Sequence, residues 1–132
     1  MEKITLKIEG TPVAQPRHRR AQSGHFYIPS NHPIHKWKEL IRLISQSEVN
    51  ESTDGYVSLS LEFILPRPKS IPESQLYSKR KPDLDNLIKA VLDALNGVVY
   101  EDDRQVYHIE AHKIYEDKIN TPGLKIKLSI KD

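Results

Sequence analysis

Four stretches of the chain alternate apolar with polar side chains, which is the period of a β-strand with one buried face. They cover residues 3–9, 57–65, 106–115 and 124–131. In the third stretch one face would carry Tyr107, Ile109, Ala111 and Tyr115, and the other His108, Glu110 and His112. In the last stretch the outward positions are Lys125, Lys127 and Lys131. The pattern predicts four strands.

Two further stretches repeat apolar residues at helical spacing. The first would start at an N-cap on Ser30 or Asn31, have Pro33 in its first turn, and bury Ile34, Trp37, Leu40, Ile41 and Ile44. The second would bury Leu84, Leu87, Ile88, Val91, Leu92 and Leu95, and end at Gly97. The order of elements predicts one domain, residues 1–132, of the α/β (α+β) class, with a small mixed or antiparallel sheet of about four strands backed by two main helices.

Two long connections are polar and interrupted by proline. Residues 11–29 are typical of an exposed basic loop, with a short hairpin turning at Ser23–Gly24. Its Phe26 and Tyr27 would suit base stacking, as its cations would suit phosphate contact. Residues 66–82 form the second connection, and a connection this long inside a compact domain is usually functional or mobile.

Charge is unevenly distributed, although the net charge is only +2. Between Glu9 and Glu39 there is no acid, and the cations there are Arg17, Arg19, Arg20, Lys36 and Lys38. Acids gather instead at residues 83–85 and 101–117. This separation is typical of a protein that holds a polyanion around a small acidic pocket, as nucleic-acid hydrolysis requires.

Composition excludes several other classes. A chain of 132 residues with 37% hydrophobic and 29% charged residues resembles an ordinary globular protein, without an apolar run that approaches a membrane span or a signal peptide. The absence of cysteine excludes disulfides and thiolate metal sites, and fits a reducing cytoplasm. No glycine-rich phosphate loop or nucleophile elbow is present.

The most informative chemistry lies at the two ends of the second helix. Asp83 lies just before the helix and Asp85 lies in its first turn. Three more acids follow the helix, where a short return of the chain would bring them back beside the first pair: Glu101, Asp102 and Asp103. Clustered carboxylates repel one another unless a cation lies among them, and oxygen ligands suit Mg²⁺ or Mn²⁺. Since Lys79, Arg80 and Lys81 directly precede Asp83 and would suit an anionic substrate, the arrangement favours metal-assisted phosphodiester hydrolysis.

Simpler explanations exist for each half of this pattern. Asp83 after Pro82 is a good N-cap, and Asp85 complements the helix dipole. Residues 101–103 alone would be a solvated turn. The positive end of the dipole also disfavours a cation, which is one reason to expect at least three carboxylates around a metal here. The histidines are weaker candidates, because His108 and His112 lie on a predicted strand and His32 and His35 lack a third ligand nearby.

Residues 81–97, from Lys81-Pro82-Asp83-Leu84-Asp85-Asn86 to Asn96-Gly97, with Glu101-Asp102-Asp103-Arg104-Gln105-Val106 after them, resemble the signature of the RusA family of Holliday junction resolvases. The leader, from Gly10-Thr11-Pro12-Val13 through Pro16-Arg17 to Tyr27-Ile28-Pro29, is similar to the first strand and basic loop of that family. The resemblance covers nearly the whole chain.

The resemblance implies a single RusA-like nuclease domain, a homodimer that cuts four-way DNA junctions symmetrically with Mg²⁺, in the cytoplasm of bacteria or encoded by their prophages. It makes Asp83, Asp85 and Asp103 the metal-binding carboxylates and Lys89 the cation near the scissile phosphate. Asn86 falls on the family's asparagine. A shorter loop between Gly97 and Glu101 leaves Asp102 as the alternative third ligand.

The expected function is therefore a structure-selective endodeoxyribonuclease of DNA recombination and repair. Its expected DNA contacts are Arg17, Arg19, Arg20, Lys79, Arg80 and Lys81. Two alternatives stay open: a non-catalytic nucleic-acid-binding protein of the same fold, and a metallonuclease acting on other branched DNA or on RNA. Cleavage of a panel of substrates would separate them.

Overall fold

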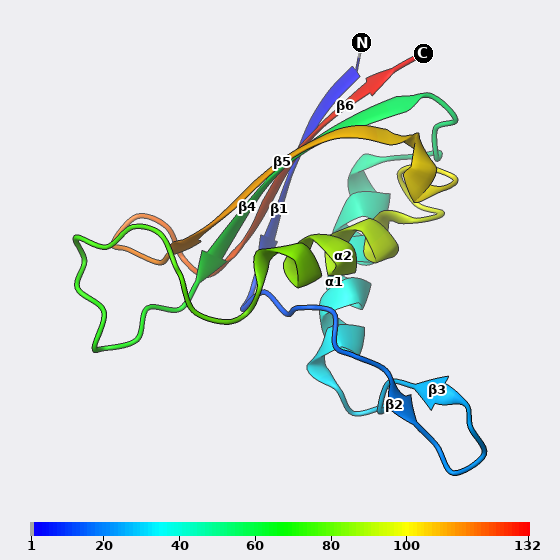
Figure 1. Ribbon diagram of the computed structural model, residues 1–132. Coiled ribbons are helices and arrows are strands. Elements are labelled where there is room, and N and C mark those ends of the chain that lie inside the picture. The colour runs from blue at the N-terminus through cyan, green and yellow to red at the C-terminus, as the bar shows by residue number, and fades with distance from the viewer. Residues whose placement is uncertain (1) are drawn as a thin grey trace.

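The structure is a computed structural model that describes residues 2–132, except for the side chain of Arg19. It has two layers, a twisted four-stranded sheet and two helices on one of its faces (Figure 1). A small hairpin projects from this body as a separate arm (Figure 1). The elements in chain order are β1 (Glu2–Glu9), β2 (Arg19–Arg20), β3 (Phe26–Tyr27), α1 (Pro33–Glu48), β4 (Tyr56–Leu65), α2 (Leu84–Leu95), η1 (Asp103–Gln105), β5 (Val106–Tyr115) and β6 (Gly123–Lys131).

The large sheet is mixed. Its strand order is β1-β6-β4-β5, and every neighbouring pair is antiparallel except β4 and β5. The parallel pair follows from the connection, because α2 lies between these two strands in the chain and returns it to the starting edge. The predicted class, a mixed α+β fold of about four strands and two helices, is confirmed.

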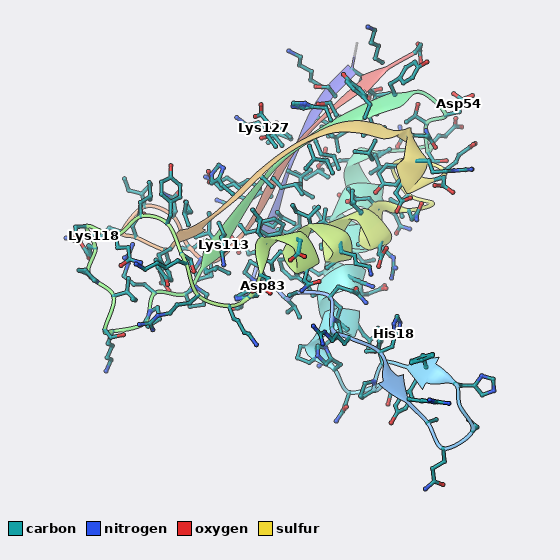
Figure 2. The ribbon with its side chains drawn as sticks, viewed as in Figure 1. His18, Asp54, Asp83, Lys113, Lys118 and Lys127 are labelled. Atoms are coloured by element: carbon teal, nitrogen blue, oxygen red, sulfur yellow. The ribbon has the colours of Figure 1, made fainter. Side chains whose placement is uncertain are left out.

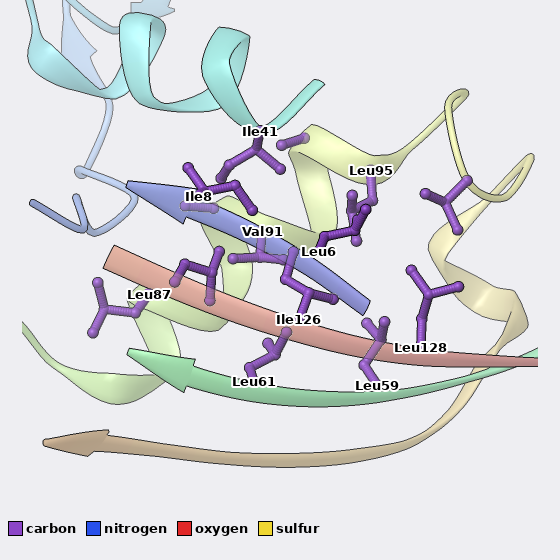
Figure 3. Close-up of a cluster of buried hydrophobic side chains, with 14 of the residues drawn as sticks. Leu6, Ile8, Ile41, Leu59, Leu61, Leu87, Val91, Leu95, Ile126 and Leu128 are labelled. Atoms are coloured by element: carbon purple, nitrogen blue, oxygen red, sulfur yellow. The ribbon is translucent and has the colours of Figure 1, made fainter. Parts of the chain in front are cut away.

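The core fills the space between the helices and the sheet (Figure 3). The sheet contributes Leu6, Ile8, Leu59, Leu61, Ile126 and Leu128, and the helices contribute Ile34, Trp37, Ile41, Leu87, Val91 and Leu95. These are the positions that the two periodicities predicted, because a buried face must recur every second residue in a strand and every third or fourth in a helix. Among residues 2–132, no helix is long and apolar enough to cross a bilayer.

Helix α1 begins later than predicted. Its N-cap is His32 rather than Ser30 or Asn31, and the Nδ1 atom of His32 accepts a hydrogen bond from the backbone N–H of Ile34 at 3.1 Å. Pro33 occupies the first helical position and disfavours helical backbone in the residue before it. The cap therefore falls on the residue that directly precedes the proline.

Strand β5 lies at the edge of the sheet, and the side chains from Tyr107 to Glu110 are exposed. Tyr107 is 61% exposed and Ile109 38% exposed. A register irregularity between Val57 and Ser58 shifts the pairing of β4 with β5 by one residue. The Tyr107 ring thereby lies against Tyr56 edge to face, with 6.2 Å between the ring centroids.

The connection from 66 to 82 is tied to the body of the protein. The guanidinium of Arg67 donates to the backbone carbonyls of Pro72 at 2.6 Å and Gln75 at 2.8 Å. Farther along, Tyr77 forms an antiparallel bridge with Ile114 on the outer edge of β5. The segment that leads into α2 is therefore fixed against β5.

Candidate active site

Two adjoining hollows lie where the basic arm meets the start of α2. Their walls come from the segment before β2, the hairpin arm, residues 81–83 and the first turns of α2. Figure 2 labels His18 on the first of these segments and Asp83 directly before α2. The lining residues are Ala14, Gln15, Pro16, Arg17, His18, Phe26, Lys81, Pro82, Asp83, Asp85, Asn86 and Lys89. Six of the twelve predicted site residues thus line these hollows: Arg17, Lys81, Asp83, Asp85, Asn86 and Lys89.

Hydrogen bonds from two other parts of the chain hold this surface in place. The backbone N–H of Gln15 donates to the carbonyl of Asn86 at 2.9 Å and joins the arm to α2. On the other side, the Lys113 ammonium donates to the carbonyls of Arg80 and Pro82, the latter at 2.8 Å. The residue just before Asp83 is therefore anchored to strand β5.

Asp83 occupies the N-cap position of α2 but does not use its side chain as a cap. Its backbone is extended, with φ −74° and ψ 139°, and its carbonyl accepts from the N–H of Leu87 at 3.1 Å. Its carboxylate is exposed and makes no capping hydrogen bond. A capping aspartate normally accepts from the second or third N–H of the helix. Capping therefore does not explain why an aspartate stands at position 83. Its carboxylate is free for another role.

Asp85 and Lys89 lie one turn apart at the start of α2, as their spacing predicted. The Asp85 carboxylate accepts from the backbone N–H of Asn86 at 2.9 Å and stays exposed. Among the described residues no ion pair joins Asp85 to Lys89, and both side chains open into the same hollow. The cation stands beside the carboxylates without neutralising either of them.

The predicted hairpin is confirmed. Arg19 pairs with Tyr27 and Arg20 with Phe26, and Gly24, with φ +88°, closes the turn. Phe26 is 69% exposed and also lines the hollow that holds Asp85. Arg17 and Arg20 are exposed on this arm, whereas the side chain of Arg19 lies outside what the structure describes. Lys79, Arg80 and Lys81 are exposed on the segment that leads into Asp83.

The second group of acids lies on the turn after α2. Asp102 caps η1 by accepting from the N–H of Arg104 at 2.9 Å, and its carboxylate is 3.3 Å from the Arg104 guanidinium. The Gln105 amide accepts from the N–H groups of Glu101 and Asp102, and donates to the carbonyls of Thr53 and Gly55. This turn is therefore fixed to the segment that precedes β4.

Neighbouring charges act differently on the two aspartates of this turn. The hydrogen bond from the Arg104 N–H lowers the pKa of Asp102. Partial burial, followed by the hydrogen bond and charge of Asp102 and the charge of Asp93, raises the pKa of Asp103. Burial also raises the pKa of Tyr100, whose hydroxyl donates to the Leu92 carbonyl at 2.7 Å. The ionised Asp103 is thus the less stabilised of the two carboxylates.

Within one chain, the two groups of acids lie at opposite ends of α2. The helix has 12 residues, which corresponds to about 18 Å. The expected return of the turn toward Asp83 does not occur, because Tyr100 anchors it beside Asp93 in the last turns of the helix. Among residues 2–132, no group of three or more His, Cys, Asp or Glu is placed to hold a metal.

Comparison with known proteins shows the family to which this chain belongs. The profile of the family described as Endodeoxyribonuclease RusA matches residues 9–129. The chain belongs to the RusA family. A relative, the uncharacterised protein YqaN of Bacillus subtilis (strain 168), is 31% identical over 130 residues, which are 89% of this chain and 92% of that protein.

The RusA match spans both groups of acids and the arm, and the family is one of endodeoxyribonucleases. Sequence reasoning missed three residues that shape the candidate site. Lys113 and Gln105 donate to backbone carbonyls that are distant in sequence, and no local pattern reveals such contacts. Gln15 lines both hollows, and its side-chain oxygen is buried without a hydrogen-bond partner among the described residues. Its only sequence signal is a polar residue between the apolar and basic parts of the leader.

The donor set of the candidate site suits a hard divalent cation in part. Asp83 and Asp85 supply exposed carboxylate oxygens, and Gln15 supplies an amide oxygen that lacks a donor. A third carboxylate is missing at this end of α2 within the described chain.

Proposed function

We propose that this protein is a homodimeric, Mg²⁺-dependent endodeoxyribonuclease that resolves four-way DNA junctions by two symmetric cuts in recombination and repair. Mn²⁺ would be a possible substitute for the ion. The observation that carries the proposal is the placement of Asp83, Asp85 and Lys89 in one hollow. Among the described side chains neither carboxylate has an ion pair, and the Asp83 carboxylate makes no capping hydrogen bond. The family match and the bacterial relative support a bacterial or prophage protein of the cytoplasm.

Each residue has a role that follows from its position. Asp83, Asp85 and Asp103 would hold the ion, with Asp102 as the alternative third ligand. When bound, Mg²⁺ supplies an activated water and offsets charge on the phosphate. Lys89, one turn into α2, would stabilise the negative charge that develops on the phosphate, because its ammonium is not engaged by Asp85.

The arm and the entry to α2 would bind the DNA backbone. Arg17, Arg20, Lys79, Arg80 and Lys81 are exposed on the segments before, within and beside the hollow, and Arg19 lies in the same hairpin. The exposed Phe26 ring at the hollow offers a surface on which a base could stack. Asn86 would help orient the phosphate from the first turn of α2.

The separation of Asp103 from Asp83 leads to the homodimer. A four-way junction has approximate two-fold symmetry and needs two cuts, which two identical sites supply. Since one chain places Asp103 about one helix length from Asp83, we propose that the partner's Asp103 completes each site. This supplies the third carboxylate that the helix dipole gives reason to expect.

The test is cleavage of a panel made of a four-way junction, a flap, a linear duplex and a branched RNA, with and without Mg²⁺. The expected result is Mg²⁺-dependent symmetric cutting of the junction, which Asp83→Asn and Asp85→Asn should abolish while metal-free junction binding holds or rises. Glu39→Gln, which removes one exposed charge on α1, is the matched control. Binding without any cutting would establish the non-catalytic alternative, and cutting of another substrate would redefine the specificity.

A further inference from the structure

One polar side chain in the wall of the two hollows is almost entirely buried. Gln15 is 8% exposed, whereas Arg17, Asp83 and Lys89, which line the same hollow, are exposed. The side-chain oxygen of Gln15 is enclosed, and no described residue donates a hydrogen bond to it. Its side-chain nitrogen is not among the enclosed groups, and an acceptor can reach it from the hollows that Gln15 lines. A buried polar group without a partner destabilises the fold, so packing alone does not explain a glutamine here.

The backbone at position 15 is fixed relative to α2. The N–H of Gln15 donates to the carbonyl of Asn86 at 2.9 Å. Val13 and Ala14, directly before it, pack against the core. Pro16 follows, and a proline disfavours helical backbone in the residue before it. The segment between β1 and β2 is therefore held at the first turn of α2 before it enters the arm (Figure 1).

Gln15 lies where the two hollows meet. The residues that line both hollows are Gln15, Pro16, Arg17, Asp83 and Asn86. From this boundary one hollow extends to Asp85 and Lys89, and the other extends to Lys81. A nucleic-acid strand that lies in both hollows, between Lys81 and Lys89, therefore crosses the boundary at Gln15.

A neutral N–H donor suits this boundary chemically. Asp83 and Asp85 form no ion pair among the described side chains, and a further cation beside them would neutralise them. An amide nitrogen can instead donate to an anionic oxygen without changing the charge of the site. Such a bond is stronger than one between two neutral groups, and more so where the donor is shielded from water. The Gln15 amide thus fits a phosphate oxygen.

We propose that Gln15 binds the nucleic-acid backbone at the active site, where its side-chain N–H donates to a non-bridging oxygen of the phosphodiester that lies beside Asp83. The inference rests on the proposed function, because it places DNA in the hollows, and it adds a neutral phosphate-binding residue to the cations named there. Since the backbone N–H of Gln15 is bonded to Asn86, the contact fixes this phosphate relative to the first turn of α2.

The first test measures binding of a four-way DNA junction without metal. Gln15→Met removes the donor and keeps a side chain of similar length, so affinity should fall about tenfold. The slope of log K against log salt concentration should not change, because glutamine carries no charge. Gln15→Lys should restore the affinity and steepen the slope by about one, since its ammonium reaches the same phosphate. Gln46→Met, the same change at an exposed position of α1, is the matched control.

Thermal unfolding without DNA separates this contact from a structural role. Gln15→Met no longer buries an amide oxygen that lacks a donor, so its melting temperature should rise while junction binding weakens. A lower melting temperature with wild-type affinity would assign Gln15 to the fold and overturn the contact. Should Gln15→Met not fold, Gln15→Glu keeps the shape of the side chain and replaces the donor with a negative charge. Wild-type affinity in this variant would equally overturn the contact.

A double-mutant cycle locates the bound phosphate. Junctions are prepared in which one linkage near the branch at a time is a methylphosphonate, which replaces a non-bridging oxygen with a methyl group. At the linkage that Gln15 contacts, the losses of affinity from Gln15→Met and from the modified DNA should not add, whereas at distant linkages they should add. Additive losses at every linkage would show that Gln15 contacts none of these phosphates.

Two further outcomes separate this contact from the metal site and from the proposed function. In titrations with Mn²⁺ but no DNA, Gln15→Met should bind the ion as wild type does, whereas Asp83→Asn should bind it more weakly. Lost Mn²⁺ affinity with unchanged junction affinity in Gln15→Met would make Gln15 a metal ligand and overturn the phosphate contact. Wild-type junction affinity in Gln15→Met refutes the contact even if the protein cuts junctions. Weakened binding in a protein that cuts nothing supports the contact and refutes only the nuclease.

Discussion

At the scale of single residues, the site differs from an ordinary helix start because two of its side chains do not form the local interactions that their positions allow. Asp83 holds the N-cap position without a capping bond, and Lys89 forms no ion pair with Asp85 among the described residues. Both groups thus give up small stabilising interactions that their positions offer. Such unused capacity is typical of residues placed for a ligand.

Lys89→Met tests this at the cation. Since Lys89 has no ion pair with Asp85 to lose, the free energy of unfolding should change by less than about 0.5 kcal/mol. The cleavage rate at saturating junction DNA should fall, because charge on the phosphate in the transition state loses its partner. Thermal unfolding and single-turnover cleavage measure the two effects. A destabilised variant with a normal rate would assign Lys89 to the fold.

Asp103→Asn should stabilise the protein in the absence of metal. The raised pKa of Asp103 means that its charge opposes folding at neutral pH, so its removal should raise stability by roughly 0.5 kcal/mol. The gain should vanish as pH falls through the pKa of Asp103, where the wild-type carboxyl is already protonated. Thermal unfolding in a chelator at neutral and acidic pH measures this, and cleavage should be lost.

Asp102→Asn is the matched control for that experiment, with the opposite sign. The lowered pKa of Asp102 means that its charge stabilises the fold above its unfolded pKa. Its removal should therefore lower stability at neutral pH, and this loss should shrink as pH falls. Equal effects of the two substitutions would show that the electrostatic difference between them does not exist.

At the scale of elements, the hairpin arm should set affinity rather than the chemical step. Replacing Arg17, Arg19 and Arg20 with Ala should weaken junction binding and reduce the slope of log K against log salt concentration by about one for each lost phosphate contact. The cutting rate of bound DNA should change little. Lys3→Ala, at an exposed position on β1 away from the arm, is the control. An unchanged slope would show that these arginines do not touch the backbone.

The helices and strands were predictable from the sequence, because each has its own local period of apolar residues. Their relative positions were not predictable, because these depend on contacts between distant parts of the chain. The stripes of α1, α2, β1, β4 and β6 match the buried core, whereas Tyr107 and Ile109 of β5 are exposed. Nothing in residues 106–115 shows that β5 lies at an edge, because that depends on β4 pairing with β6 on its other side. Likewise the acidic turn goes to Asp93 instead of Asp85, because Tyr100 and Gln105 anchor it, the latter through a contact 52 residues away in sequence.

At the scale of the whole molecule, a site shared between chains predicts complementation. Asp83→Asn and Asp103→Asn should each be inactive alone. In a mixed dimer of these two variants, one site carries both substitutions and the other carries neither. Mixing the inactive proteins should therefore restore cutting at one strand, seen as a nicked junction on a denaturing gel. If mixtures remain inactive although the variants exchange subunits, all three carboxylates belong to one chain.

The Gln105 amide uses its full capacity, because its oxygen accepts two hydrogen bonds and its nitrogen donates two. No other side chain of this length offers both functions. Glutamate has the same shape but would face two carbonyl oxygens with a negative charge, and lysine would face two N–H groups with a positive one. Exchanging a single nitrogen for oxygen at position 105 should therefore detach the acidic turn from residues 53–55, and the aspartates would move while the sheet behind them stayed intact.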